Sequence, residues 1–229
     1  MPGDVEITKS PDSGLVLSNQ NIILVGQQTN VFHRYPANHF LAFQVIFQLS
    51  ALYLLRKIPS YELTNQIIDA ETIFGKSIKL VNEQLFYAKD YAEMICIVEQ
   101  FLTTLIQKRE TKRHPVNEIS SMMLQAQEGL SVDKFLHAAC LSHRQFDRKF
   151  KESTGIAPKQ FLQLIRFDRA FRMKNRFPGK DWLSIALHCG YYDYQHLVKD
   201  YKEFTGYTPV QFFEIDNKAP ERAFGEAEV

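Results

Sequence analysis

The chain has 229 residues, 45% of them hydrophobic, which is enough for two modest domains with separate cores. Its 27 Lys and Arg against 26 Asp and Glu leave a net charge of +1, which by itself indicates no nucleic-acid or membrane partner. Three widely spaced cysteines, an N-terminus without the apolar core of a signal peptide and the absence of a membrane-length apolar run predict a cytoplasmic protein with no membrane partner.

The first half of the sequence predicts a small α+β domain. Short apolar runs broken by Asn, Gly and Pro predict three strands of one sheet, at residues 15–20, 22–28 and 40–48. From about residue 50 the apolar period becomes helical, with segments at 50–58, 77–88 and 90–108. We expect residues 1–112 to form a short N-terminal domain.

The 90–108 segment has apolar residues at i, i+3, i+4 and i+7, with Asp90 suited to the N-cap. Two interpretations of this stripe stay open: packing within its own domain, or the seam of a homodimer.

The second half predicts short helices only. The polar stretch 107–115 ends in Pro115 and is the best candidate linker. Residues 113–213 are then a second domain, and 214–229 an acidic, disordered tail. Helix starts and stops are signalled by prolines, capping residues and glycines, namely Pro115, Gly129, Ser131, Ser142 with Gln145, Gly155, Pro158, Asp181, Asp193 and Gly206.

Charge is distributed unevenly between these parts. Residues 131–213 hold fourteen Lys and Arg against eight Asp and Glu, a net +6, whereas residues 214–229 carry a net −3. A basic block inside a nearly neutral chain is typical of a nucleic-acid-binding surface.

One stretch of sequence occurs twice. Residues 146–162 and 197–213 share seven identities in seventeen positions, where ordinary residue frequencies predict roughly one. Each copy follows a short helix and a tight turn near Cys140 or Gly190. A short helix, a turn and a second capped helix describe a helix-turn-helix, whose second helix enters the DNA major groove.

The candidate DNA-binding residues lie on the second helix of each copy. Arg suits guanine and Gln suits adenine, Lys suits phosphate, and Asp147 could accept from cytosine or pair with an Arg. The set is Ser142, His143, Arg144, Asp147, Arg148 and Lys151 in the first copy, and Tyr194, Gln195, His196, Lys199 and Lys202 in the second. Between the copies, residues 158–175 would span about 27 Å as a helix, which is compatible with two helices one DNA turn apart.

From about Ser131 to Phe213 the chain resembles the DNA-binding domain of the AraC/XylS family of bacterial transcription regulators. The resemblance rests on "SHRQFDRKFKESTG", on "IRFDRAFRM" with Arg166, Arg169 and Ala170, and on "SIALHCGYYDYQHLVKDYKEFTGYTPVQF". It implies two helix-turn-helix subdomains joined by a helix, with base or backbone contacts from Arg144, Asp147, Arg148, Tyr194, Gln195 and Lys199. Departures from the family pattern are Leu136, Cys140 and Leu197, where a small residue, Gly and an aromatic residue respectively are usual.

The resemblance also sets the expected partners. They are double-stranded DNA, RNA polymerase and a second copy of the chain through the 90–108 helix, with a small-molecule effector left open. Residues 25–75 look like the later part of a sensor domain found in a subset of these regulators.

Other function classes have less support in the sequence. There is no nucleophile elbow, phosphate-binding glycine loop or HExxH motif, so we expect no enzyme and no cofactor. His137 with Cys140 and His188 with Cys189 lack zinc-site spacing, so we expect no metal site. The alternative function is a protein-interaction module that keeps the fold without binding DNA.

Overall fold

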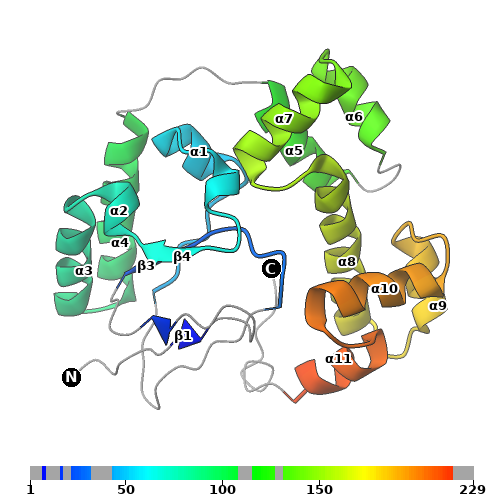
Figure 1. The fold of residues 1–229 in the computed structure, drawn as a ribbon. Helices are drawn as coiled ribbons and strands as arrows, with labels where there is room; N and C mark the ends of the chain where they lie inside the picture. The colour runs from blue at the N-terminus through cyan, green and yellow to red at the C-terminus, as the bar shows by residue number, and fades with distance from the viewer. Residues whose placement is uncertain are drawn as a thin grey trace. The chain divides into compact units, whose positions relative to one another are not determined.

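The computed structural model describes residues 7–8, 16–17, 22–31, 43–107, 115–126 and 131–218 (Figure 1). These residues are mainly helical and confirm the predicted fold class: a small α+β part, then an all-α part with two helix-turn-helix units joined by a helix. The chain divides into two compact units, one comprising Met1–Met122 with Phe135–Pro158 and the other Met123–Lys134 with Lys159–Val229. The predicted domain limits at 112/113 and 213/214 stay a prediction. Within the described ranges, no helix is long and apolar enough to cross a membrane.

The strands pair in a way that the sequence did not indicate. β1 (Ile7–Thr8) pairs antiparallel with β2 (Val16–Leu17), and β3 (Ile23–Val25) pairs antiparallel with β4 (Ile67–Asp69). The strand expected at 40–48 is wrong for residues 43–48, which form no strand; residues 40–42 lie outside the described part. Ile46 in this run is 82% exposed, so no sheet neighbour covers it, and strand formation depends on such cover.

Five helical elements follow in the N-terminal region. They are α1 (Ala51–Arg56), the 3₁₀ turn η1 (Ser60–Glu62), α2 (Glu71–Phe74), α3 (Ser77–Tyr87) and α4 (Tyr91–Gln107). The carboxylate of Asp90 accepts the backbone N–H of Glu93 at 2.8 Å, which confirms the predicted N-cap of α4. Phe101 and Leu105 of α4 pack against a core built on Leu24, Leu63, Ala70, Ile73 and Phe74. Part of the α4 stripe therefore packs within its own domain.

Gly26 lies against the backbone of Leu63. A Cβ at Gly26 would lie 1.8 Å from the carbonyl oxygen of Leu63, a separation that no side chain tolerates. The segment after η1 is also tied to the end of β3 by the backbone bonds Gly26 N–H to Gln66 O (3.0 Å) and Asn65 N–H to Gln27 O (2.9 Å). The N-terminal core thus fixes the position of η1.

The C-terminal part contains seven helices among the described residues. They are α5 (Pro115–Gln125), α6 (Val132–Ala139), α7 (His143–Thr154), α8 (Pro158–Arg176), α9 (Trp182–His188), α10 (Tyr194–Thr205) and α11 (Pro209–Asp216). The predicted starts at Pro115 and Pro158 are confirmed. The linker residues 108–114, Gly129 and tail residues 219–229 lie outside the described part, while α11 continues to Asp216, inside the predicted tail.

The second unit has its own core under α10. Ala170 of α8, Ile185 and Ala186 of α9, and Leu197 and Tyr201 of α10 are completely buried. Trp182 packs its ring edge-on against Tyr201, with ring centroids 5.6 Å apart, and is one of the partly buried residues packed against this core. The Lys174 ammonium is also buried; it donates to the carbonyls of Pro178 (2.6 Å) and Lys180 (2.9 Å) and closes the turn after α8.

Candidate nucleic-acid interface

Two helix pairs have the form of a helix-turn-helix. We call α6 with α7 the first reading head and α9 with α10 the second reading head. In the first, the chain turns at Cys140, whose φ is 52°; in the second it turns at Gly190, whose φ is 83°. Both residues have left-handed backbone, so the predicted tight turns at these positions are confirmed. Figure 1 shows α9 and α10 packed side by side after such a turn.

Both second helices begin at a side-chain cap. Ser142 and Gln145 form the predicted capping box of α7, in which the Ser142 hydroxyl accepts the N–H of Gln145 and the Gln145 side chain accepts the N–H of Ser142. The Asp193 carboxylate caps α10 by accepting the N–H of His196 at 2.8 Å. This hydrogen bond from the backbone of His196 is the main cause that lowers the pKa of Asp193 from its ordinary value. Gly155 and Gly206, both with positive φ, end the two helices.

Each of these helices buries one face completely. Phe146 and Phe150 of α7 are 0% exposed, with ring centroids 5.6 Å apart, and Leu197 and Tyr201 of α10 are also 0% exposed. A helix with one face in the core must present its other face outward. The apolar repeat positions therefore set which side of α7 and α10 can meet a ligand.

Most of the predicted site residues lie on the outward face. In the first reading head Asp147 is half-buried and the others are exposed, namely Ser142, His143, Arg144, Arg148 and Lys151. In the second, Gln195, His196, Lys199 and Lys202 are exposed. Tyr194 is half-buried because it packs against the core of the second unit, so its ring has a structural contact that the sequence did not predict.

A histidine is paired with an aspartate at the start of both helices. His143 Nδ1 lies 3.2 Å from Asp147 Oδ2, and His196 Nδ1 lies 2.8 Å from the capping oxygen of Asp193. Asp147 thus pairs with a histidine rather than with an arginine. The exposed guanidinium groups of Arg144 and Arg148 lie on the same helix.

The residues singled out on α8 have structural roles. The Arg166 guanidinium lies over the Tyr191 ring, 5.4 Å from its centroid, and Ala170 is fully buried. Arg169 donates to the carbonyls of Leu124 and Ala126, where α5 ends. These contacts connect α8 to the end of α5 and to Tyr191.

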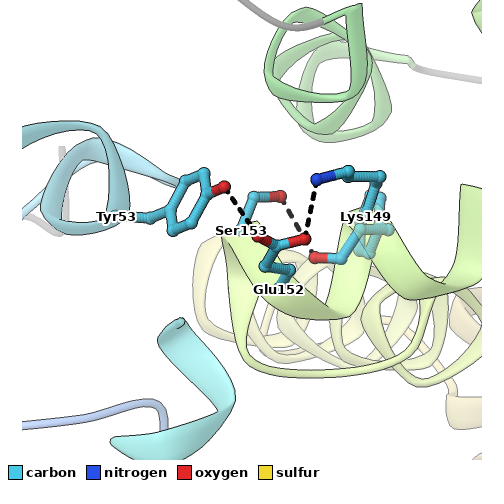
Figure 2. Close-up of polar contacts among 5 residues, drawn as sticks. Tyr53, Lys149, Glu152 and Ser153 are labelled. Atoms are coloured by element: carbon cyan, nitrogen blue, oxygen red, sulfur yellow. Dashed lines mark hydrogen bonds and ion pairs between the residues drawn. The ribbon is translucent and has the colours of Figure 1, made fainter. Parts of the chain in front are cut away.

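Sequence reasoning missed a contact between the N-terminal region and α7 (Figure 2). The Tyr53 hydroxyl donates to Glu152 Oε1 at 2.9 Å, and the Lys149 ammonium lies 3.0 Å from Glu152 Oε2. Burial raises the pKa of Glu152, but the hydrogen bonds from Lys149 and Tyr53 outweigh it and hold this pKa below its ordinary value. Glu152 is one of the identical positions of the repeat and recurs as Glu203. No local sequence pattern, however, connects Glu152 with Tyr53, which lies 99 positions earlier.

No site for a metal was found in the described part of the chain, where no three His, Cys, Asp or Glu side chains gather in a metal-binding group. Cys140 and Cys96 are exposed thiols and Cys189 is buried. Burial raises the pKa of the Cys189 thiol.

Known proteins are similar in sequence to this part of the chain. A family model described as "Helix-turn-helix domain" matches residues 135–215. The HTH-type transcriptional regulator ArgR of Pseudomonas aeruginosa is 29% identical over 106 residues, which are 45% of this chain and 32% of that protein. MtrA of Neisseria gonorrhoeae, also an HTH-type transcriptional regulator, is 29% identical over 82 residues, which are 36% of this chain and 27% of that protein. The match therefore spans about a third or less of these relatives.

Two solved structures are similar to this chain at lower sequence identity. The DNA-binding domain of AdpA, a global transcriptional factor in complex with a target DNA, has 24% identity and a TM-score of 0.43, covering 48% of this chain and 99% of that one. ToxT from Vibrio cholerae has 11% identity and a TM-score of 0.48, covering 95% of this chain and 87% of that one.

The curated relatives are named as transcriptional regulators. Both predicted helix-turn-helix units are present, and the family model covers the first from Phe135 onward and the second completely. Residues 135–215 match the helix-turn-helix domain of transcriptional regulators, which supports the expected resemblance to the AraC/XylS family over this part of the chain.

Proposed function

We propose that this chain is a sequence-specific DNA-binding transcriptional regulator that inserts α7 and α10 into successive major grooves of a promoter site. One observation carries the proposal: both helices bury an apolar face completely and expose base-reading and cationic side chains on the other. In a helix-turn-helix the N-terminal residues of this second helix meet the base edges. The outward residues begin in the first turn of both helices.

The exposed residue types suit distinct parts of DNA. Arg144 and Arg148 can each donate two hydrogen bonds to one guanine, and Gln195 can bond an adenine in the same bidentate way. The ammonium groups of Lys151, Lys199 and Lys202 carry the charge that phosphates need. Base reading is thus assigned to Arg144, Arg148 and Gln195, and phosphate binding to Lys151, Lys199 and Lys202.

The connecting helix has a suitable length. α8 runs for 19 residues, about 28 Å at 1.5 Å per residue. Successive major grooves on one side of DNA lie about 34 Å apart. A helix of this length with its flanking turns is compatible with the proposed spacing.

Further partners belong to the same proposal. A second copy of the chain would dock on α4, where Tyr91, Ile95 and Ile106 are exposed although they are apolar. Such a regulator would work in the bacterial cytoplasm, where it would meet promoter DNA and RNA polymerase. An effector stays open.

The experiment is DNA affinity against salt concentration, using random and selected duplexes. Lys and Arg contacts to phosphate release counterions, so the logarithm of the binding constant should fall linearly with the logarithm of salt concentration. Lys151→Ala should reduce this slope by about 1, whereas Lys76→Ala, a change at an exposed lysine of the N-terminal region, should not. An affinity independent of salt contradicts the proposal and favours an interaction module.

A further inference from the structure

The two reading heads form hydrogen bonds with different parts of the chain. Glu152 of α7 and Glu203 of α10 stand at the same place in the repeat. Glu152 accepts its hydrogen bond from Tyr53 of the N-terminal region, whereas Glu203 accepts one from Gln163 of α8 at 3.1 Å. The same carboxylate position therefore has a different support in each copy.

The support of the first reading head extends over the whole last turn of α7. Besides the Tyr53 bond, the Ser60 hydroxyl donates to the carbonyl of Ser153 at 2.8 Å, and the Thr64 hydroxyl donates to the carbonyl of Gly155 at 3.0 Å. Carbonyls at a helix C-terminus have no partner within the helix. The N-terminal region thus supplies side-chain donors that cap α7.

The capping segment is itself fixed. Leu63 lies in the N-terminal core, Gly26 packs directly on its carbonyl, and the Asn65 side chain accepts the N–H of Thr29 at 2.8 Å. A displacement of the N-terminal core would therefore move Ser60 and Thr64, and with them the end of α7. The contact leaves the outward residues of the first helical turns exposed.

The second reading head is supported by α8. Gln163 also donates to the buried carboxylate of Asp200 at 2.9 Å. Ala170 of α8 lies in the same core as Leu197 and Tyr201 of α10. Gly206 is exposed, whereas its counterpart Gly155 is buried beneath Thr64.

From these contacts we infer that the N-terminal region is a positioning element for the first reading head, so that it sets how well one half-site is read while α8 sets the other. Tyr53, Ser60 and Thr64 are positioning residues: they touch α7 and not the DNA. A state of the N-terminal core that releases them weakens base discrimination in one half-site and leaves the other unchanged. The inference rests on the proposed function, because it concerns how two half-sites are read.

The test uses the full chain and a duplex selected for binding. Arg148→Ala and Gln195→Ala first identify which base positions belong to which head. The double variant Tyr53→Phe with Thr64→Val then removes two hydroxyl donors, and Tyr61→Phe in the neighbouring 3₁₀ turn η1 is the matched control. Lost support lowers the population of the competent helix orientation, so we expect about a 3- to 10-fold loss of discrimination at the Arg148 positions. Gln163→Ala should instead affect the Gln195 positions.

The outcomes separate the two claims. Equal losses in both halves, or no loss in either, for the double variant overturn the inference while leaving the proposed function intact. A wild-type chain with no base preference overturns the proposed function and the inference with it. If the double variant unfolds, as judged by its thermal midpoint, Ser60→Ala provides the milder change, and the same half-site pattern is required of it.

Discussion

Cys140 and Gly190 occupy the same turn in the two reading heads, and both have left-handed backbone, with φ of 52° and 83°. The second head uses the residue that adopts this conformation without strain, whereas the first places a side chain there. The turn geometry is thus retained even where the sequence departs from glycine.

Replacing the strained cysteine should stabilise the protein. Cys140→Gly removes a strain of about 1–2 kcal/mol from the folded state, because glycine adopts the left-handed conformation freely. Glycine also raises the conformational entropy of the unfolded chain, which offsets part of this gain, so the free energy of unfolding should rise by about 0.5–1 kcal/mol. Gly190→Ala should lower it by about 1 kcal/mol. Urea denaturation of both variants measures the effect. A Cys140→Gly protein less stable than the wild type would show that the thiol contributes more than the turn strain costs.

The two helix-ending glycines should differ in their tolerance of alanine. Both have positive φ, which costs about 1–2 kcal/mol for alanine. At Gly155 the new Cβ would also lie 2.7 Å from Thr64 Oγ1 and 3.1 Å from Ser60 O, so about 1–3 kcal/mol of crowding adds to that cost. Gly155→Ala should therefore be the more destabilising variant in thermal unfolding. Similar losses at Gly155 and Gly206 would argue against close packing of η1 on α7.

Acid should weaken the contact between Tyr53 and Glu152. The pKa of Glu152 is held below its ordinary value of 4.5, so its ionised form stabilises the folded state above that value. As the pH falls below 4.5, Glu152 becomes protonated and this contribution disappears. Glu152→Gln should cost about 1 kcal/mol at pH 7 and progressively less below pH 4.5. Denaturation midpoints from pH 7 to 3 measure this, with exposed Glu83→Gln as control; a difference that stays constant with pH contradicts the assignment.

Alanine substitutions of base-reading and of phosphate-binding residues should have different effects on DNA binding. Arg148→Ala or Gln195→Ala should reduce discrimination between the preferred and a substituted base by about 1–3 kcal/mol. Lys151→Ala should weaken all sequences alike. Competition binding with matched and scrambled duplexes separates these effects. Equal losses on both duplexes for Arg148→Ala would remove it from the base-reading residues.

Local signals in the sequence predicted the C-terminal helices well. Ser142 with Gln145, Asp181 and Asp193 act within three residues of their partners, so the caps of α7, α9 and α10 could be identified without any tertiary information. The repeat added the correspondence between α7 and α10. The outward residues followed from it, because the positions of Phe146 and Phe150 define the buried face.

Long-range features could not be predicted in this way. β3 pairs with β4 across more than forty residues, whereas the apolar run at 43–48 looks like a strand and has no sheet partner. The bond from Tyr53 to Glu152 likewise joins residues 99 apart. Such contacts depend on the tertiary packing of the N-terminal region, and neither periodicity nor capping residues encode that packing.

We propose that α7 and α10 read two half-sites of one DNA duplex. The decisive experiment is the selection of bound sequences from a random DNA pool by the full chain. We expect two short conserved blocks whose centres lie about 10 base pairs apart, one lost with Arg148→Ala and the other with Gln195→Ala. A pool that yields a single block unaffected by one of these changes, or no enriched sequence at all, would contradict it.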